Sequence, residues 1–225
     1  GVVSRTLLAD KIILDAGLTT GLPPAVTAAT GIDAMVHAIE AFTTKNKKNP
    51  LSDMLAREAL RLMAGNIETA VKQGDNLEAR SAMLLGAMLA GQAFANAPVA
   101  AVHALAYPLG GNYHIPHGLS NSLVLPHVLR FNGLEAGHQY AELAPIILPG
   151  KTLPEDPLAV TELLATYFLQ LAEDLGLPTT LRQMSIDESD LPMLAEQAML
   201  QQRLLINNPR DVSFDDALAI YQRAF

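Results

Sequence analysis

The chain has 225 residues, a formal net charge of −8, 50% hydrophobic and only 5% aromatic residues, and neither tryptophan nor cysteine. This length can bury a sizeable core, as one large domain or two small ones. The negative charge disfavours nucleic acid and anionic membranes as partners, and the lack of cysteine excludes disulfides and thiolate metal sites.

The apolar residues are mainly Ala, Leu, Ile, Val and Met, and three of these types favour helices. We therefore predict an all-α fold. We find no apolar run of about 20 residues, the length that a membrane span needs, and no signal-peptide pattern. A cytoplasmic protein is expected.

The first predicted element is a single strand over residues 7–15, where Ile12 and Ile13 lie in a short apolar run. No later segment offers an obvious partner strand, and a lone strand is not stable in water. We therefore expect this strand to pair with another chain, or with a sheet that lies outside this sequence.

From Pro24 onward the apolar residues recur at helical spacing, and Pro24 itself suits the first turn of a helix. A proline at position 126 predicts a kink or break, and residues 149–157 are expected to form a surface loop. A capping box of Ser213 and Asp216 is expected to start the last helix. The predicted helices are 25–42, 51–73 ended by Gly74, 77–96 capped by Asn76, 99–111 ended by two glycines, 118–131, 158–175, 191–202 and 214–225.

Asp33 and His37 lie four residues apart on the first of these helices, so both side chains share one face and can bind the same ion. A structural role also fits this pair, because a buried Asp and His need hydrogen-bond partners. His103 and His117 favour the metal, since the proline- and glycine-rich segment between them could bring both rings to one point. One carboxylate and three imidazoles fit Fe(II), Zn(II), Mn(II), Co(II) or Ni(II).

Other residues near this set are weaker candidates. Tyr107 follows His103 by one helical turn, so its hydroxyl could point toward the site, although a buried tyrosine with one hydrogen bond is the alternative. His114 could line the pocket. His127 and His138 are expected to be structural or solvated.

Two long motifs carry a resemblance to a known family. The run AATGIDAMVHAIE at 28–40 is similar to the first signature of the iron-containing (group III) alcohol dehydrogenases, and residues 103–118 resemble the second. Shorter matches occur at 90–96, 125–128 and 207–210. The resemblance covers nearly the whole chain.

The resemblance implies a two-domain enzyme, with an N-terminal α/β domain for NAD or NADP and an all-helical, dehydroquinate synthase-like C-terminal domain for the metal. Residues 1–20 would then be the residual strand and linker of a missing nucleotide-binding domain, and 21–225 the metal-binding catalytic domain. It also implies Fe(II) or Zn(II) as the metal. The implied metal ligands are Asp33, His37, His103 and His117.

The implied reaction is oxidation of an alcohol to an aldehyde or ketone with NAD(P). We find no glycine-rich phosphate loop, so the cofactor-binding residues stay unknown. For the same reason, the chain on its own can bind metal yet fail to turn over a substrate. The family has a histidine where this chain has Tyr107, and a phenol with an ordinary pKa of about 10 is a poorer acid–base group at neutral pH. Tyr107 is nevertheless the catalytic candidate.

A tyrosine at this place also resembles the branch of the family that acts on hydroxyacids. The alternatives are therefore a hydroxyacid–oxoacid transhydrogenase, a maleylacetate reductase-like enzyme, or a metal-binding helical fragment without catalysis. The expected partner is a small alcohol or carbonyl substrate and, if the chain assembles, a second copy in a homodimer. Nucleic acid and membrane are not expected partners.

Overall fold

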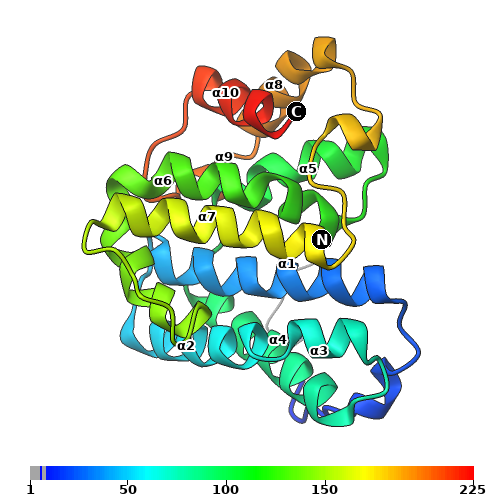
Figure 1. Ribbon diagram of the computed structural model, residues 1–225. Coiled ribbons are helices and arrows are strands. Elements are labelled where there is room, and N and C mark those ends of the chain that lie inside the picture. Colours follow the sequence, from blue (N-terminus) through cyan, green and yellow to red (C-terminus); the bar gives the residue numbers. More distant parts are fainter. Residues whose placement is uncertain (1–5, 7–8) are drawn as a thin grey trace.

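A computed structural model describes residue 6 and residues 9–225, and this part of the chain is helical, with no strand in it (Figure 1). The all-α class predicted from composition is confirmed. In chain order the elements are η2 (Ala16–Thr19), α1 (Pro24–Thr43), α2 (Pro50–Ala64), α3 (Ile67–Lys72), α4 (Leu77–Asn96), α5 (Ala101–Tyr113), α6 (His117–Ile147), α7 (Pro157–Asp174), η3 (Arg182–Met184), η4 (Glu188–Asp190), α8 (Leu191–Met199), α9 (Gln202–Leu205) and α10 (Phe214–Ala224).

The predicted strand at 7–15 is wrong for the part that the structure describes. Residues 7 and 8 lie outside the described residues, and 9–15 form neither helix nor strand. Ile12 and Ile13 are exposed. A strand is stable only beside another strand, and the described residues offer none. The division of the chain at residue 20 stays a prediction.

Helix α1 lies at the centre of the bundle, between the layer of α6 and α7 on one side and α2 to α4 on the other (Figure 1). Its apolar residues are buried on nearly all sides, which explains how a helix this apolar is stable. Gly31 allows the close packing against α4, since a Cβ atom there would lie 2.9 Å from the methyl carbon of Met83.

Helix α6 is much longer than predicted, because it continues past residue 131 and through Pro145 to Ile147; it also runs without a break through Pro126. Proline removes one backbone hydrogen bond from a helix and usually kinks or ends it. Here the residues on both sides of Pro126 are buried, so tertiary packing outweighs the local preference. The expectation that the helix ends near residue 131 is wrong.

Three other boundaries differ from the prediction. The helix predicted at 51–73 is divided at Gly65 and Asn66 into α2 and α3. Helix α5 runs through Gly110 and Gly111 and ends at Tyr113, and the helix predicted at 191–202 ends at Met199. The glycines in α5 can adopt helical torsion angles, so they do not force an end.

Helices with strong local signals were predicted well. Helix α4 has the predicted bounds, and the amide of Ala79 donates to the side chain of Asn76 at 3.0 Å. The capping box of Ser213 and Asp216 is present at the start of α10. Within the described residues, no single helix is both long and apolar enough to cross a membrane; α4 and α5 would qualify only as a pair bent by 107°.

Candidate metal centre

The four predicted ligand side chains converge on one point. Ligand atoms of Asp33 and His37 on α1, His103 on α5 and His117 on α6 all lie within 4.8 Å of one another. The first two stand one turn apart on α1, as the helical spacing predicts. Their role as metal ligands stays a prediction, but the convergence itself is a property of the fold.

A tight turn brings the two later histidines together. His103 lies in the first turn of α5 and His117 is the first residue of α6. Between the helices, His114 has a left-handed conformation with φ 55°, which reverses the chain, and Pro116 precedes the new helix. The ring centroids of His103 and His117 are 5.3 Å apart.

The distances between the ligand atoms fit one divalent ion. His103 Nε2 lies 3.0 Å from Nε2 of His37 and 3.8 Å from Oδ1 of Asp33, and His117 Nε2 lies 3.7 Å from the same oxygen. Two ligands about 2.1 Å from a tetrahedral ion would be about 3.4 Å apart. Moreover, two imidazole nitrogens that face each other at 3.0 Å repel unless a proton or a cation lies between them.

The pKa values of His37 and His103 are shifted in opposite directions by their surroundings. Burial, reinforced by the neighbouring His103, lowers the pKa of His37 to about 4, so this imidazole is neutral at pH 7. Neutral imidazole is the form that binds a metal. Burial also opposes charge on His103, but the carboxylates of Glu40 and Asp33 outweigh it and raise the pKa of His103.

Sequence reasoning missed two residues that contact the ligands. Glu40 Oε2 accepts a hydrogen bond from Nδ1 of His103 at 2.6 Å. The Asn121 amide donates to Oδ1 of Asp33 at 2.5 Å and lies 3.2 Å from Nε2 of His117, while its own oxygen is buried with no hydrogen-bond partner among the described residues. Helical spacing could have indicated both, because each lies three or four residues after a predicted ligand.

Of the other candidate residues, only Tyr107 borders the cluster as expected. Tyr107 is half-buried, and its ring centroid lies 5.9 Å from that of His117. His114 is an exposed residue at the end of α5 and is not one of the converging ligands. His127 is buried, and burial together with the charge of Arg130 lowers its pKa to about 4; His138 is exposed.

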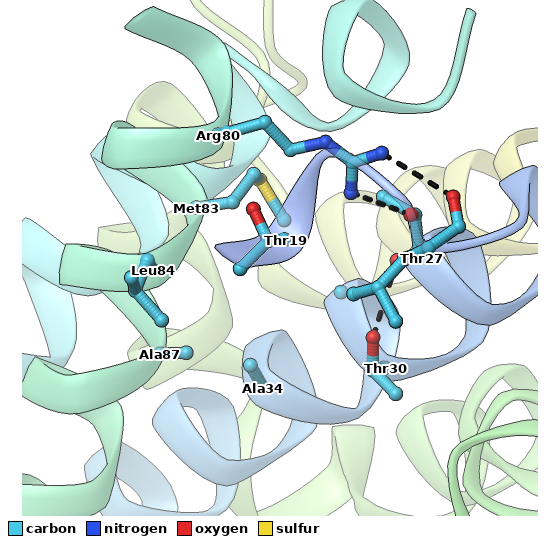
Figure 2. Close-up of a pocket in the computed structure, with 10 residues that line it drawn as sticks. Thr19, Thr27, Thr30, Ala34, Arg80, Met83, Leu84 and Ala87 are labelled. Atoms are coloured by element: carbon cyan, nitrogen blue, oxygen red, sulfur yellow. Dashed lines mark hydrogen bonds between the residues drawn. The ribbon is translucent and has the colours of Figure 1, made fainter. Parts of the chain in front are cut away.

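A small apolar pocket of about 150 Å³ is lined by residues of η2, α1 and α4 (Figure 2). The buried guanidinium of Arg80 donates to the hydroxyl of Thr27 at 2.6 Å and to the carbonyl of Gly74 at 2.9 Å. Pockets that hold whole ligands of drug size are typically about 300–1,000 Å³, so this one assigns no nucleotide-binding residue. It is lined by Thr19, Leu22, Thr27, Thr30, Gly31, Ala34, Arg80, Met83, Leu84 and Ala87.

The fold and the cluster define an all-helical domain with a candidate mononuclear metal centre, built where three helices meet. Comparison with known families identifies it further. The profile described as "Fe-containing alcohol dehydrogenase family, C-terminal" matches residues 27–225. The chain belongs to this family, of which it matches the C-terminal domain.

Individual relatives agree with this assignment. The chain is 42% identical over 224 residues to "Long-chain-alcohol dehydrogenase 1" of Geobacillus thermodenitrificans, which covers 97% of the chain and 55% of the relative. The chain spans about half the length of the curated relatives that it matches, 57% and 55% for the first two.

Solved structures show the same fold. The crystal structure of a 1,3-propanediol oxidoreductase matches with a TM-score of 0.88 and 40% identity, over 94% of this chain and 55% of that one. A sulfoacetaldehyde reductase from Bifidobacterium kashiwanohense in complex with NAD+ matches with a TM-score of 0.81 and 29% identity, over 93% and 53%.

Proposed function

We propose that the chain is the metal-binding half of a NAD(P)-dependent alcohol dehydrogenase, which converts an alcohol to an aldehyde or ketone. The observation that carries the proposal is the convergence of Asp33, His37, His103 and His117 within 4.8 Å. We infer that these residues hold Fe(II) or Zn(II), since three imidazoles and one carboxylate suit either ion. The names of the relatives, which include alcohol dehydrogenases, support the reaction class.

A divalent ion held there would act as a Lewis acid toward the oxygen of an alcohol or carbonyl substrate. The exposure of the ligands indicates the direction from which that substrate would arrive. The side chain of His103 is only 3% exposed, whereas that of His117 is 48% exposed. A substrate would therefore reach the cluster from the His117 side, where Tyr107 also lies.

The nicotinamide cofactor would accept the hydride, and the protein would supply position and charge. We propose that NAD or NADP is bound mainly by residues outside this chain, because its sequence has no glycine-rich phosphate loop and spans about half the length of the curated relatives that it matches. A small alcohol or carbonyl compound is the proposed substrate. We also propose that the protein is cytoplasmic.

The test is an activity assay on the protein expressed from its complete gene, loaded with Fe(II) or Zn(II). We expect NAD(P)H to form with a member of a panel of primary alcohols and hydroxyacids. A chelator should remove the activity and added metal should restore it. Absence of turnover with every alcohol and hydroxyacid, at full metal occupancy and with either nucleotide, would contradict the proposal. Oxidation of a hydroxyacid only when an oxoacid is supplied as the hydride acceptor, with no net NAD(P)H, would favour the transhydrogenase alternative.

Tyr107→Phe tests the proposed catalytic tyrosine. General acid–base groups typically contribute about 10²–10⁴-fold to a rate, so in the same complete protein we expect kcat to fall at least about 10-fold while metal content is unchanged. Tyr113→Phe is the matched control: Tyr113 lies on the same helix, but its hydroxyl donates to Asp190. Equal kcat values for wild type and Tyr107→Phe would remove Tyr107 from the reaction.

A further inference from the structure

Glu40 is a buried carboxylate whose two oxygens serve two different groups of α5. It lies on α1, three residues after His37, and is only 4% exposed. Its Oε2 accepts a hydrogen bond from Nδ1 of His103 at 2.6 Å, and its Oε1 accepts the backbone N–H of Val102 at 2.7 Å. Both oxygens therefore bind to neighbouring residues in the first turn of one helix.

The backbone contact has a clear structural reason. The first amides of a helix have no partner within the helix and need an acceptor from elsewhere. Helix α5 follows Ala100, which makes no side-chain capping bond. Glu40 supplies the missing acceptor from another helix, and a negative charge is favourable at that position.

The contact with His103 has a consequence for the metal centre. An ionised carboxylate can only accept hydrogen bonds, so Nδ1 of His103 must carry the proton. In the neutral ring, Nε2 is then left with a free lone pair. It is Nε2 that lies 3.0 Å from His37 Nε2 and faces Asp33 across the cluster.

We propose that Glu40 is a positioning residue that fixes the rotation and the tautomer of His103, so that Nε2 is presented to the metal ion. The inference rests on the proposed function, because it requires that the cluster holds an ion. Outer partners of metal-bound histidines typically change metal affinity about 10–100-fold when they are mutated. A residue that only capped α5 would change stability without this loss of affinity.

Glu40→Gln separates these two roles. Glutamine has nearly the same shape, and its oxygen can still accept the N–H of Val102. Its NH₂ group then faces Nδ1 of His103, which must become the acceptor, so that the proton moves to Nε2 and blocks metal binding. Because both hydrogen bonds persist in this arrangement, the fold should be retained.

The experiment uses the 225-residue chain, titrated with Zn(II) against a chelating dye and with Co(II) followed by its absorption spectrum. We expect Glu40→Gln to bind both ions about 10–100-fold more weakly than wild type and to show an altered Co(II) spectrum. Its metal-free melting temperature should stay close to that of wild type. Glu58→Gln is the control, because Glu58 is exposed on α2 and pairs with Arg61 away from the site.

Zinc affinity of Glu40→Gln within about twofold of wild type would overturn the inference, whatever its melting temperature. If Glu40→Gln fails to fold, Glu40→Asp and Glu40→Ala replace it. The aspartate keeps an acceptor for Nδ1 and should bind zinc more tightly than the alanine; equal affinities would again overturn the inference. If wild type itself binds no better than His103→Ala, the proposed metal site fails, which is a separate result.

Discussion

His103→Ala is expected to abolish stoichiometric binding of a divalent ion. His103 is buried, and its Nε2 lies 3.0 Å from Nε2 of His37 and 3.8 Å from Oδ1 of Asp33. Alanine removes one of the four proposed ligands and also leaves the buried carboxylate of Glu40 without one of its hydrogen-bond partners. An unsatisfied buried polar group costs about 1–3 kcal/mol, more when it is charged, so this variant should also be less stable.

His117→Ala separates ligation from folding. The His117 side chain is 48% exposed, so its loss should change stability little while removing the same kind of ligand. We expect both variants, prepared anaerobically, to lose the metal that wild type retains, as measured by elemental analysis. His138→Ala is the control, since His138 is exposed on α6 outside the cluster. Full occupancy in both ligand variants would refute the assignment.

Gly118→Ala is expected to destabilise the fold and disrupt the metal centre together. A Cβ atom at Gly118 would lie 2.5 Å from the backbone oxygen of Ala29 and 2.8 Å from its carbonyl carbon. These are backbone atoms of α1, so the clash can be relieved only by moving α6 away. Because His117 is the neighbouring residue, such a movement would also separate it from Asp33.

Overpacking of this kind typically costs about 1–3 kcal/mol, and we expect the upper part of that range from chemical denaturation, with weaker zinc binding. Gly111→Ala is the matched control, because the site on α5 is exposed and has no atom within 4 Å of an added Cβ. Alanine favours a helix more than glycine does, so this control should be as stable as wild type or more so. Wild-type stability and affinity in Gly118→Ala would contradict the expected clash.

The fold could be predicted from sequence wherever the signal is local. Asn76 and Ser213 cap the helices that follow them, and both starts were predicted correctly. The continuation of α6 past residue 131 and through Pro145 was not predicted, because buried contacts with other helices outweigh the local effect of proline. The strand was wrong for a related reason, since strand formation depends on a partner that the residues themselves do not specify.

The candidate site could likewise be predicted where the signal is local, and could not where it depends on contacts between helices. The spacing of Asp33 and His37 predicts a shared helix face, and the residue types of His103 and His117 complete a plausible ligand set. Glu40 and Asn121 lie one helical turn after His37 and His117, so helical spacing alone could have placed them near the site. Their bonds to His103 and Asp33 join different helices, more than 60 positions apart in sequence. A single sequence does not contain those tertiary contacts, so it does not show what the two residues orient.

The most direct test of the central claim is anomalous X-ray diffraction from crystals of the zinc-loaded chain, measured at the zinc absorption edge. We expect one strong peak among the four side chains, about 2.0–2.2 Å from three imidazole nitrogens and one carboxylate oxygen. The same peak should be absent from His117→Ala crystals. A zinc peak elsewhere on the chain, with none between Asp33, His37, His103 and His117, would contradict the account.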